Sequence, residues 1–250
     1  MSIHLRSKLV QYSMSIPVKK EEHYVEINTI PCIIYMCDKT LDNITIFSKN
    51  WTRLNPDYEL RLYDNEKCES FLLTEFGQKY VDVFRYLKDG PIKSDFWRVC
   101  VLYKYGGIYS DADNEPLVSL KDIIDPNIDF LTCSSYADDH KYNPNLIMAK
   151  QNDMFMKKAI DMYLQWYDEK KEYSYWDWSI MTVFDKVLPI LGKEDGIYNH
   201  EGKRIQLFRE CPGNSYNDAH NMYKGTRVFN NRYKIYDPFR HSFRMEYHTE

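Results

Sequence analysis

Residues 91–117, PIKSDFWRVCVLYKYGGIYSDADNEPL, decide the fold of this chain. The stretch opens with a proline, a residue suited to the first turn of a helix, and its apolar residues then recur at helical spacing. Gly106 and Gly107 follow, and glycine is the usual residue just past the C-terminus of a helix. The sequence therefore predicts a helix that ends at the double glycine, with a short strand beginning at Ile108.

Two aspartates stand at the end of this predicted strand. Asp111 and Asp113 are two residues apart, so they point to the same side of a strand. Adjacent carboxylates repel each other, and a divalent cation removes the conflict because Mg²⁺ and Mn²⁺ prefer carboxylate oxygen ligands. The spacing predicts a metal site, and the alternative is a solvated turn.

Asp95 and Arg98 lie on the preceding helix. They are three residues apart and therefore share a helix face. Because their helix leads directly into the strand that carries the acidic pair, we expect all four polar side chains to meet at the carboxyl end of that strand. Open α/β sheets generally bind ligands at such ends. The alternative for Asp95 and Arg98 is a surface ion pair.

The combination of helix Asp/Arg, double glycine and Asp-x-Asp resembles the signature of glycosyltransferase family 32. The matching segments are residues 94–98 (SDFWR) and 105–113 (YGGIYSDAD). This family contains DxD sugar transferases related to fungal initiating mannosyltransferases, and the run is also similar to the glucosyltransferase domains of the large clostridial toxins. The resemblance implies an α/β, GT-A-like (Rossmann-like) fold with a mostly parallel central sheet flanked by helices.

The resemblance also assigns roles to the four polar residues. Asp113, assisted by Asp111, is expected to hold Mn²⁺, or alternatively Mg²⁺, and Asp111 also to face the ribose of the donor. Asp95 is expected to bind hydroxyls of the donor sugar or ribose, and Arg98 the sugar and the diphosphate, which the planar fork of arginine donors suits. The family is retaining, so no separate general base is required.

The substrates follow from the same resemblance. It implies a nucleotide-sugar donor, either GDP-mannose or a UDP-hexose, and a glycan or other hydroxyl-bearing molecule as acceptor. Nothing in the sequence separates a guanine from a uracil donor.

Three further site residues rest on segments that resemble the family. Residues 30–37 are predicted to form the first buried strand, and the resemblance places Tyr35 near the nucleotide base; the alternative is a core aromatic. Asn145 matches an asparagine near the donor sugar, with a turn residue as the alternative. His241 is the nearest counterpart of a histidine that approaches the metal in relatives, with His248 as the alternative.

The remaining sequence predicts one domain. Residues 30–88 alternate strand and helix patterns, which predicts a parallel sheet wrapped by helices. Further helices are expected from Met154, capped by Asp153, and over residues 176–188, with another strand at 204–208. We expect residues 1–29 to be an N-terminal arm or peripheral helix, and residues 30–250 to form the catalytic domain.

Composition narrows the class of protein. The chain has 250 residues and a net charge of −4, which argues against a broad surface for nucleic acid. Six cysteines without a CxxC spacing indicate reduced core residues rather than a disulfide framework. No signal peptide or transmembrane segment is evident, which predicts either a cytoplasmic enzyme or a catalytic domain cut from a longer protein.

Two other functions compete with a sugar transferase. A metal-dependent phosphohydrolase or nuclease also uses paired carboxylates, but it would need further acidic or histidine ligands, and a nuclease would favour a basic groove. A non-catalytic sugar- or nucleotide-binding domain would retain the fold but not require all four polar residues. The presence of all four favours the transferase.

Overall fold

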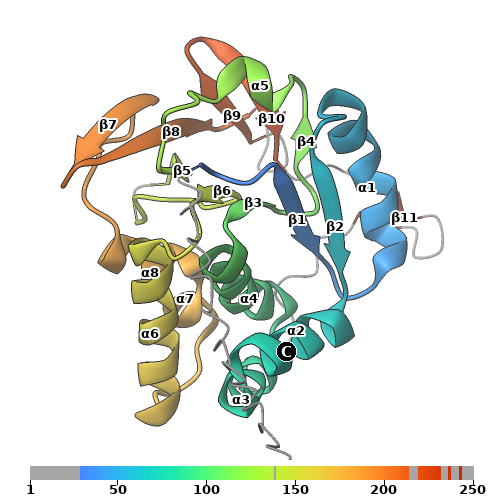
Figure 1. Ribbon diagram of the computed structural model, residues 1–250, viewed down its shortest axis with the longest axis vertical. Coiled ribbons are helices and arrows are strands. Elements are labelled where there is room, and N and C mark those ends of the chain that lie inside the picture. Colours follow the sequence, from blue (N-terminus) through green and yellow to red (C-terminus); the bar gives the residue numbers. More distant parts are fainter. Residues whose placement is uncertain (1–28, 138, 214–218, 232–235, 238–241, 244–250) are drawn as a thin grey trace, which may run out of the picture.

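The computed structural model describes residues 29–137, 139–213, 219–231, 236–237 and 242–243. In these residues the chain forms an α/β fold, a ten-stranded sheet with helices on both faces (Figure 1). The strands of this sheet are β1 (Ile33–Cys37), β2 (Glu59–Tyr63), β3 (Gly107–Ser110), β4 (Glu115–Pro116), β5 (Phe130–Ser134), β6 (Leu146–Ala149), β7 (Gly196–His200), β8 (Lys203–Cys211), β9 (His220–Tyr223) and β10 (Thr226–Asn230). A separate ribbon consists of β11 (Tyr236–Asp237) and β12 (Ser242–Phe243). The helices are α1 (Leu41–Leu54), α2 (Asn65–Phe76), α3 (Gln78–Tyr86), α4 (Gly90–Tyr105), α5 (Leu120–Ile123), α6 (Met154–Asp168), α7 (Tyr175–Trp178) and α8 (Ile180–Val187).

The sheet is mixed, so the prediction of a mostly parallel sheet is wrong. Its order is β2-β1-β3-β6-β5-β8-β9-β10-β4, with β7 beside β8. Strands β2, β1 and β3 run parallel, as do β5 and β8, but β6 is antiparallel to both of its neighbours. Parallel neighbours need a crossover connection, whereas β6 follows β5 through a loop without a helix, and β9 and β10 form a hairpin.

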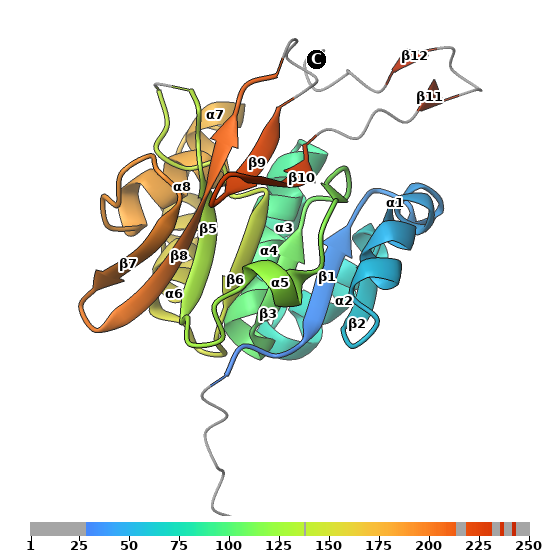
Figure 2. The same cartoon turned by 90° about the horizontal axis from the view of Figure 1, so that it is seen from above.

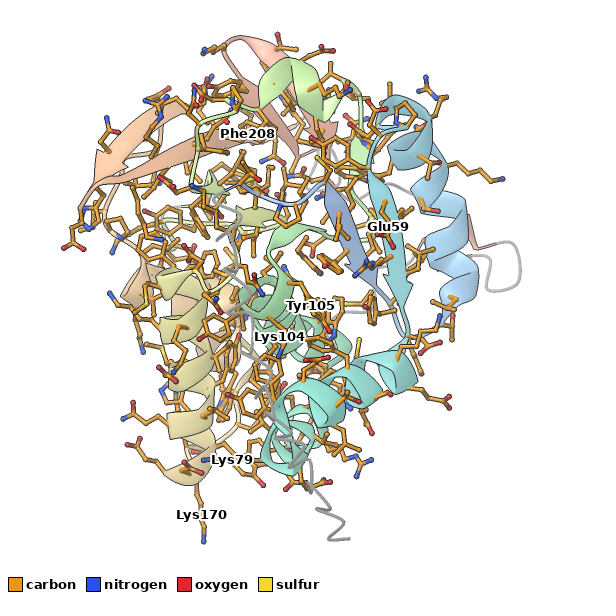
Figure 3. The ribbon with its side chains drawn as sticks, viewed as in Figure 1. Glu59, Lys79, Lys104, Tyr105, Lys170 and Phe208 are labelled. Carbon is orange, nitrogen blue, oxygen red and sulfur yellow. The ribbon has the colours of Figure 1, made fainter. Side chains whose placement is uncertain are left out.

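Helix α4 is the central helix of the larger core. It begins with Pro91 in its first turn and ends at Gly106, as the sequence predicted. Its buried face packs against α6 and the sheet (Figure 1). At its C-terminal end, Lys104 and Tyr105 both bind Glu75 of α2, at 2.9 Å and 2.7 Å (Figure 3). The helix is thereby fixed at the end that lies away from the aspartates.

Both faces of the sheet are buried, because alternate side chains of its central strands enter different cores. Tyr35 of β1 and Tyr109 of β3 pack under α2, α3, α4 and α6, while Ile34 and Ile108 pack with α1 and α5 on the other face. Figure 2 shows this arrangement from above, with β1, β3, β6 and β5 between the two groups of helices. The strand ends between these layers are where the polar residues gather.

Two helix boundaries bear on the site. The prediction that Asp153 caps α6 is confirmed, since its carboxylate accepts hydrogen bonds from the first-turn amides. The helix predicted over residues 176–188 is broken at Ser179 into α7 and α8. The Ser179 hydroxyl accepts the amide of Thr182, a cap that starts a new helix because serine offers the backbone an alternative partner.

Two sequence predictions concern the periphery. Residues 1–28 of the predicted N-terminal arm lie outside the described residues. Cys68, Cys100 and Cys133 are buried thiols, as expected, but Cys32 is exposed.

None of the helices formed by the described residues combines the length and the hydrophobicity needed to cross a bilayer.

Gly106→Ala is expected to destabilise the fold more than Gly77→Ala. Both glycines end a helix in nearly the same backbone conformation, with φ of 65° and 91°, where a side chain costs about 1–3 kcal/mol. A Cβ at Gly106 would lie 2.7 Å from the Gln151 nitrogen, whereas nothing lies within 4 Å at Gly77. Urea denaturation should therefore show an additional loss of about 1–3 kcal/mol for Gly106→Ala. Equal losses would contradict the steric argument.

Candidate functional site

A buried ion pair, Asp95–Arg98, and the partly exposed Asp111 form an ion network at the carboxyl end of β3. Arg98 Nη2 is 2.7 Å from Asp95 Oδ1 and 3.1 Å from Asp111 Oδ1. The structure therefore brings three of the four predicted polar residues into direct contact, and Asp113, which is partly buried, follows Asp111 by two positions. The alternative of a surface ion pair is wrong, because the side chains of Asp95 and Arg98 are only 6% and 5% exposed.

Burial controls the electrostatics of this network. It raises the pKa of Asp95 to about 6, although Arg98 and the amide of Ile180 favour the charged form. Burial also raises the pKa of Asp111, and the positive charge of Arg98 again opposes this shift by favouring the ionised carboxylate. Arg98 therefore supplies the positive charge that favours the ionised form of both carboxylates, the buried Asp95 and the 30% exposed Asp111.

Tyr109 supports Asp111 from the same strand. Its hydroxyl donates to Asp111 Oδ1 at 2.8 Å and lies 2.8 Å from Ser94 Oγ, which in turn lies 2.9 Å from Cys37 Sγ. The guanidinium carbon of Arg98 stacks 4.1 Å from the centroid of the Tyr109 ring. Sequence reasoning missed this residue, although its position two residues before Asp111 places it on the same side of the strand.

Asn114 fixes the turn that carries the two aspartates. Its side-chain amide donates to the Asn145 carbonyl at 2.8 Å and to Ser110 Oγ at 3.1 Å. Its own carbonyl accepts the indole N–H of the buried Trp51 at 3.0 Å. Helix α1 is thus attached directly to the turn. Sequence reasoning missed the contacts of Asn114 with Asn145 and Trp51 because they join residues 31 and 63 positions apart.

The two predicted donor-binding residues occupy different surroundings. The carbonyl of Asn145 accepts the Asp111 amide at 2.9 Å, so Asn145 lies directly beside the aspartates. Its side chain is buried and donates to Asn221 Oδ1 at 3.1 Å. Tyr35 is fully buried in the core on β1, which favours the core aromatic, and its assignment to the nucleotide base stays a prediction.

The break between α7 and α8 reaches the network from the other side of the core. The amide of Ile180 donates to Asp95 Oδ2 at 2.9 Å. Asp95 therefore uses one oxygen for Arg98 and the other for the first residue of α8. A backbone donor has no sequence signature, so this contact could not be predicted.

The donor set at the turn fits a hard divalent cation. Asp111 and Asp113 would supply carboxylate oxygens, and Asn114 Oδ1 is buried with no hydrogen-bond partner. Within the described residues, no group of three or more His, Cys, Asp or Glu side chains forms a complete metal site. Such a two-carboxylate site is typical of metals that complete their coordination with substrate phosphates and water. The predicted third ligand, His241, lies outside the described residues.

Comparisons with known proteins agree with this geometry. Residues 42–130 match the family model described as a glycosyltransferase sugar-binding region containing a DXD motif. The matched segment holds Asp95, Arg98, Asp111 and Asp113, so the resemblance predicted from the sequence is confirmed. The match thus concerns the sugar-binding region of glycosyltransferases.

Curated relatives match over parts of their length. The initiation-specific α-1,6-mannosyltransferase of Candida albicans is 23% identical over 139 residues, which cover 52% of this chain and 31% of that protein. The enzyme of the same name from Schizosaccharomyces pombe is 31% identical over 75 residues, 28% of this chain and 19% of that protein. An uncharacterized glycosyltransferase of Acanthamoeba polyphaga mimivirus is 30% identical over 67 residues, 27% of each. The chain thus matches about a third or less of the length of these relatives.

A solved structure supports the fold. The PaToxG glycosyltransferase superimposes with a TM-score of 0.51 at 19% identity, covering 64% of this chain and 69% of that one. This likeness concerns the arrangement of helices and strands.

Asp95→Asn is expected to destabilise the protein by about 1–3 kcal/mol, because the buried Arg98 loses the closer of its two carboxylates and keeps only Asp111 at 3.1 Å. The amide would also have to present its NH₂ group either to Arg98 or to the Ile180 amide, both of which are donors. Urea denaturation measures the change. Glu59→Gln is the control: the Arg61–Glu59 pair has the same charges at 2.8 Å but is exposed, so its loss should hardly move the unfolding midpoint. Similar effects of the two variants would contradict the importance of burial.

Tyr109→Phe should leave the core packing intact and remove one donor from Asp111. Asp111 Oδ1 would keep Arg98 but lose the 2.8 Å hydroxyl contact. We expect a modest loss of stability, about 1–3 kcal/mol for a hydrogen bond to a charged group, and weaker Mn²⁺ binding. Titration of Mn²⁺ by calorimetry or electron paramagnetic resonance measures the latter. Unchanged metal affinity would show that Tyr109 does not position Asp111.

Proposed function

We propose that this protein is a metal-dependent, retaining glycosyltransferase that moves a sugar from a nucleotide-sugar donor to a hydroxyl acceptor. The observation that carries the proposal is the Asp95–Arg98–Asp111 ion network, two residues before Asp113 in the chain and inside the segment that matches a glycosyltransferase sugar-binding region. We further propose that residues 30–250 form a GT-A-type catalytic domain, with the helices and mixed sheet holding these groups at one strand end.

Asp113 and Asp111 would hold Mn²⁺, or Mg²⁺. When bound, the cation neutralises negative charge that grows on the departing diphosphate. Arg98 adds a fixed positive charge at the same strand end, and because it is already held by two carboxylates it needs no reorganisation during the reaction. The hydrogen bond from Tyr109 holds Asp111 in one orientation.

Asp95 would bind hydroxyls of the donor sugar or ribose. Each of its oxygens already accepts one hydrogen bond, from Arg98 or from Ile180, and a carboxylate oxygen has capacity for a second. The side-chain oxygen of Asn145 is buried without a partner and could accept another hydroxyl. The donor is GDP-mannose or a UDP-hexose, and the acceptor a glycan or another hydroxyl-bearing molecule.

Nucleotide sugars are expected to stabilise the protein only when the metal is present. A panel of GDP-mannose, UDP-glucose, UDP-galactose and UDP-N-acetylglucosamine, each with and without Mn²⁺, should shift the melting temperature for one donor. A ligand at a hundredfold excess over its Kd stabilises the folded state by about 2.7 kcal/mol. A shift that does not depend on metal would favour a non-catalytic binding domain, and no shift with any donor would remove the nucleotide-sugar assignment.

Asp113→Asn should reduce transfer at least about 100-fold, the cost of removing one group that stabilises charge in a transition state. The substitution removes a charge but little volume, so the melting temperature should stay near that of the wild type. Sugar transfer is measured as release of nucleoside diphosphate with acceptor present. Asp122→Asn, which changes an exposed carboxylate of α5, is the matched control. Wild-type turnover of Asp113→Asn would exclude this residue from the metal site.

A further inference from the structure

Trp176 differs from the other four tryptophans of this chain in its exposure to solvent. Its exposed fraction is 50%, whereas the other four are at most 8% exposed. Trp178, two residues further along α7, is fully buried. Exposure of a large indole ring is unfavourable in water, and tryptophan is enriched where it later meets a ligand or partner.

Trp176 has partners at its backbone carbonyl and neighbours at its ring. Its carbonyl accepts hydrogen bonds from Ser179 Oγ at 2.9 Å and from Thr182 Oγ1 at 2.8 Å. On its sides, the His140 ring stacks at 6.2 Å with an interplanar angle of 29°, and the Tyr175 ring meets it edge-on at 5.1 Å. A side chain whose ring already has neighbours on two sides loses less conformational entropy when a ligand binds than one without such contacts.

His140 is itself oriented by a carboxylate. Its Nδ1 lies 3.0 Å from Asp185 Oδ2, while the other oxygen of Asp185 accepts the amide of Lys141 at 2.9 Å. Because a carboxylate only accepts hydrogen bonds, Nδ1 carries the proton in this contact. In the neutral imidazole, Nε2 is then an acceptor beside the indole ring.

These residues are connected to the DxD turn by two short segments. Trp176 lies just before Ile180, whose amide binds Asp95. His140 lies in the loop that leads to Asn145, whose carbonyl accepts the Asp111 amide. Figure 2 shows α7 at the end of the sheet toward which β1 points, the end that carries the aspartates. The two sets of residues therefore lie at the same edge of the sheet.

We propose that Trp176, with His140 and Tyr175, forms a saccharide-binding platform that receives a pyranose ring of the acceptor. The weakly positive C–H groups of a pyranose face match the negative face of an aromatic ring, and its hydroxyls can donate to His140 Nε2. The proposal rests on the proposed glycosyltransferase function and names the acceptor side of that site.

The test compares Trp176→Ala with the wild type. Methyl glycosides of mannose, glucose, galactose and N-acetylglucosamine are examined singly by saturation-transfer NMR, and the glycoside that binds is then used as acceptor. We expect Trp176→Ala to weaken binding of that glycoside and to raise its KM at least tenfold, and Trp176→Phe to restore part of the loss. The metal-dependent thermal shift with the nucleotide sugar should remain. Leu73→Ala, which truncates a 51% exposed apolar residue of α2, is the matched control and should behave as the wild type.

Three results would overturn the platform: no methyl glycoside binds the wild type, Trp176→Ala binds it as well as the wild type, or UDP rather than a glycoside loses affinity in Trp176→Ala. Failure of the proposed function looks different. In that case the wild-type protein shows no metal-dependent shift with any nucleotide sugar, whatever the glycosides do.

Discussion

The position of one guanidinium group determines how the rest of this structure is arranged. Arg98 lies between the carboxylates of Asp95 and Asp111, and burial raises the pKa of both. Each carboxylate ties α4 to another part of the fold. Asp111 ends β3, and Asp95 binds the first amide of α8. Because an uncompensated buried charge is costly, helix α4, strand β3 and the α7–α8 junction are held at fixed distances from one another.

The mixed sheet has a direct consequence for the site. Strand β6 is antiparallel to β3, so it begins where β3 ends, and the loop before it supplies Asn145 beside Asp111. A parallel strand at that position would have placed Asn145 at the opposite edge of the sheet. The same loop carries His140, so the departure from a parallel sheet brings two polar residues to the DxD end.

Local sequence features predicted the central helix and strand correctly. The helical spacing and the double glycine predicted α4 and β3. The two-residue period holds as far as Asp111, directly after β3, but Asp113 lies in the turn that follows, so its place beside Asp111 stays a prediction. Asp95 and Arg98 share a helix face one turn apart, which needs no tertiary information. The same two-residue period would also have identified Tyr109. Burial of the ion pair could not be predicted, because i,i+3 spacing is the same on a solvated helix and on a buried one.

The sequence by itself determined which elements form around the aspartates, since helix caps, glycine turns and periodicity act between residues close together in the chain. Only the tertiary structure decided what these elements meet. The Ile180 amide reaches Asp95 across 85 positions, and the Trp51 indole reaches the carbonyl of Asn114 across 63. A backbone N–H or C=O is present at almost every residue, so no residue type marks the one that will be used; packing of the two cores makes that choice.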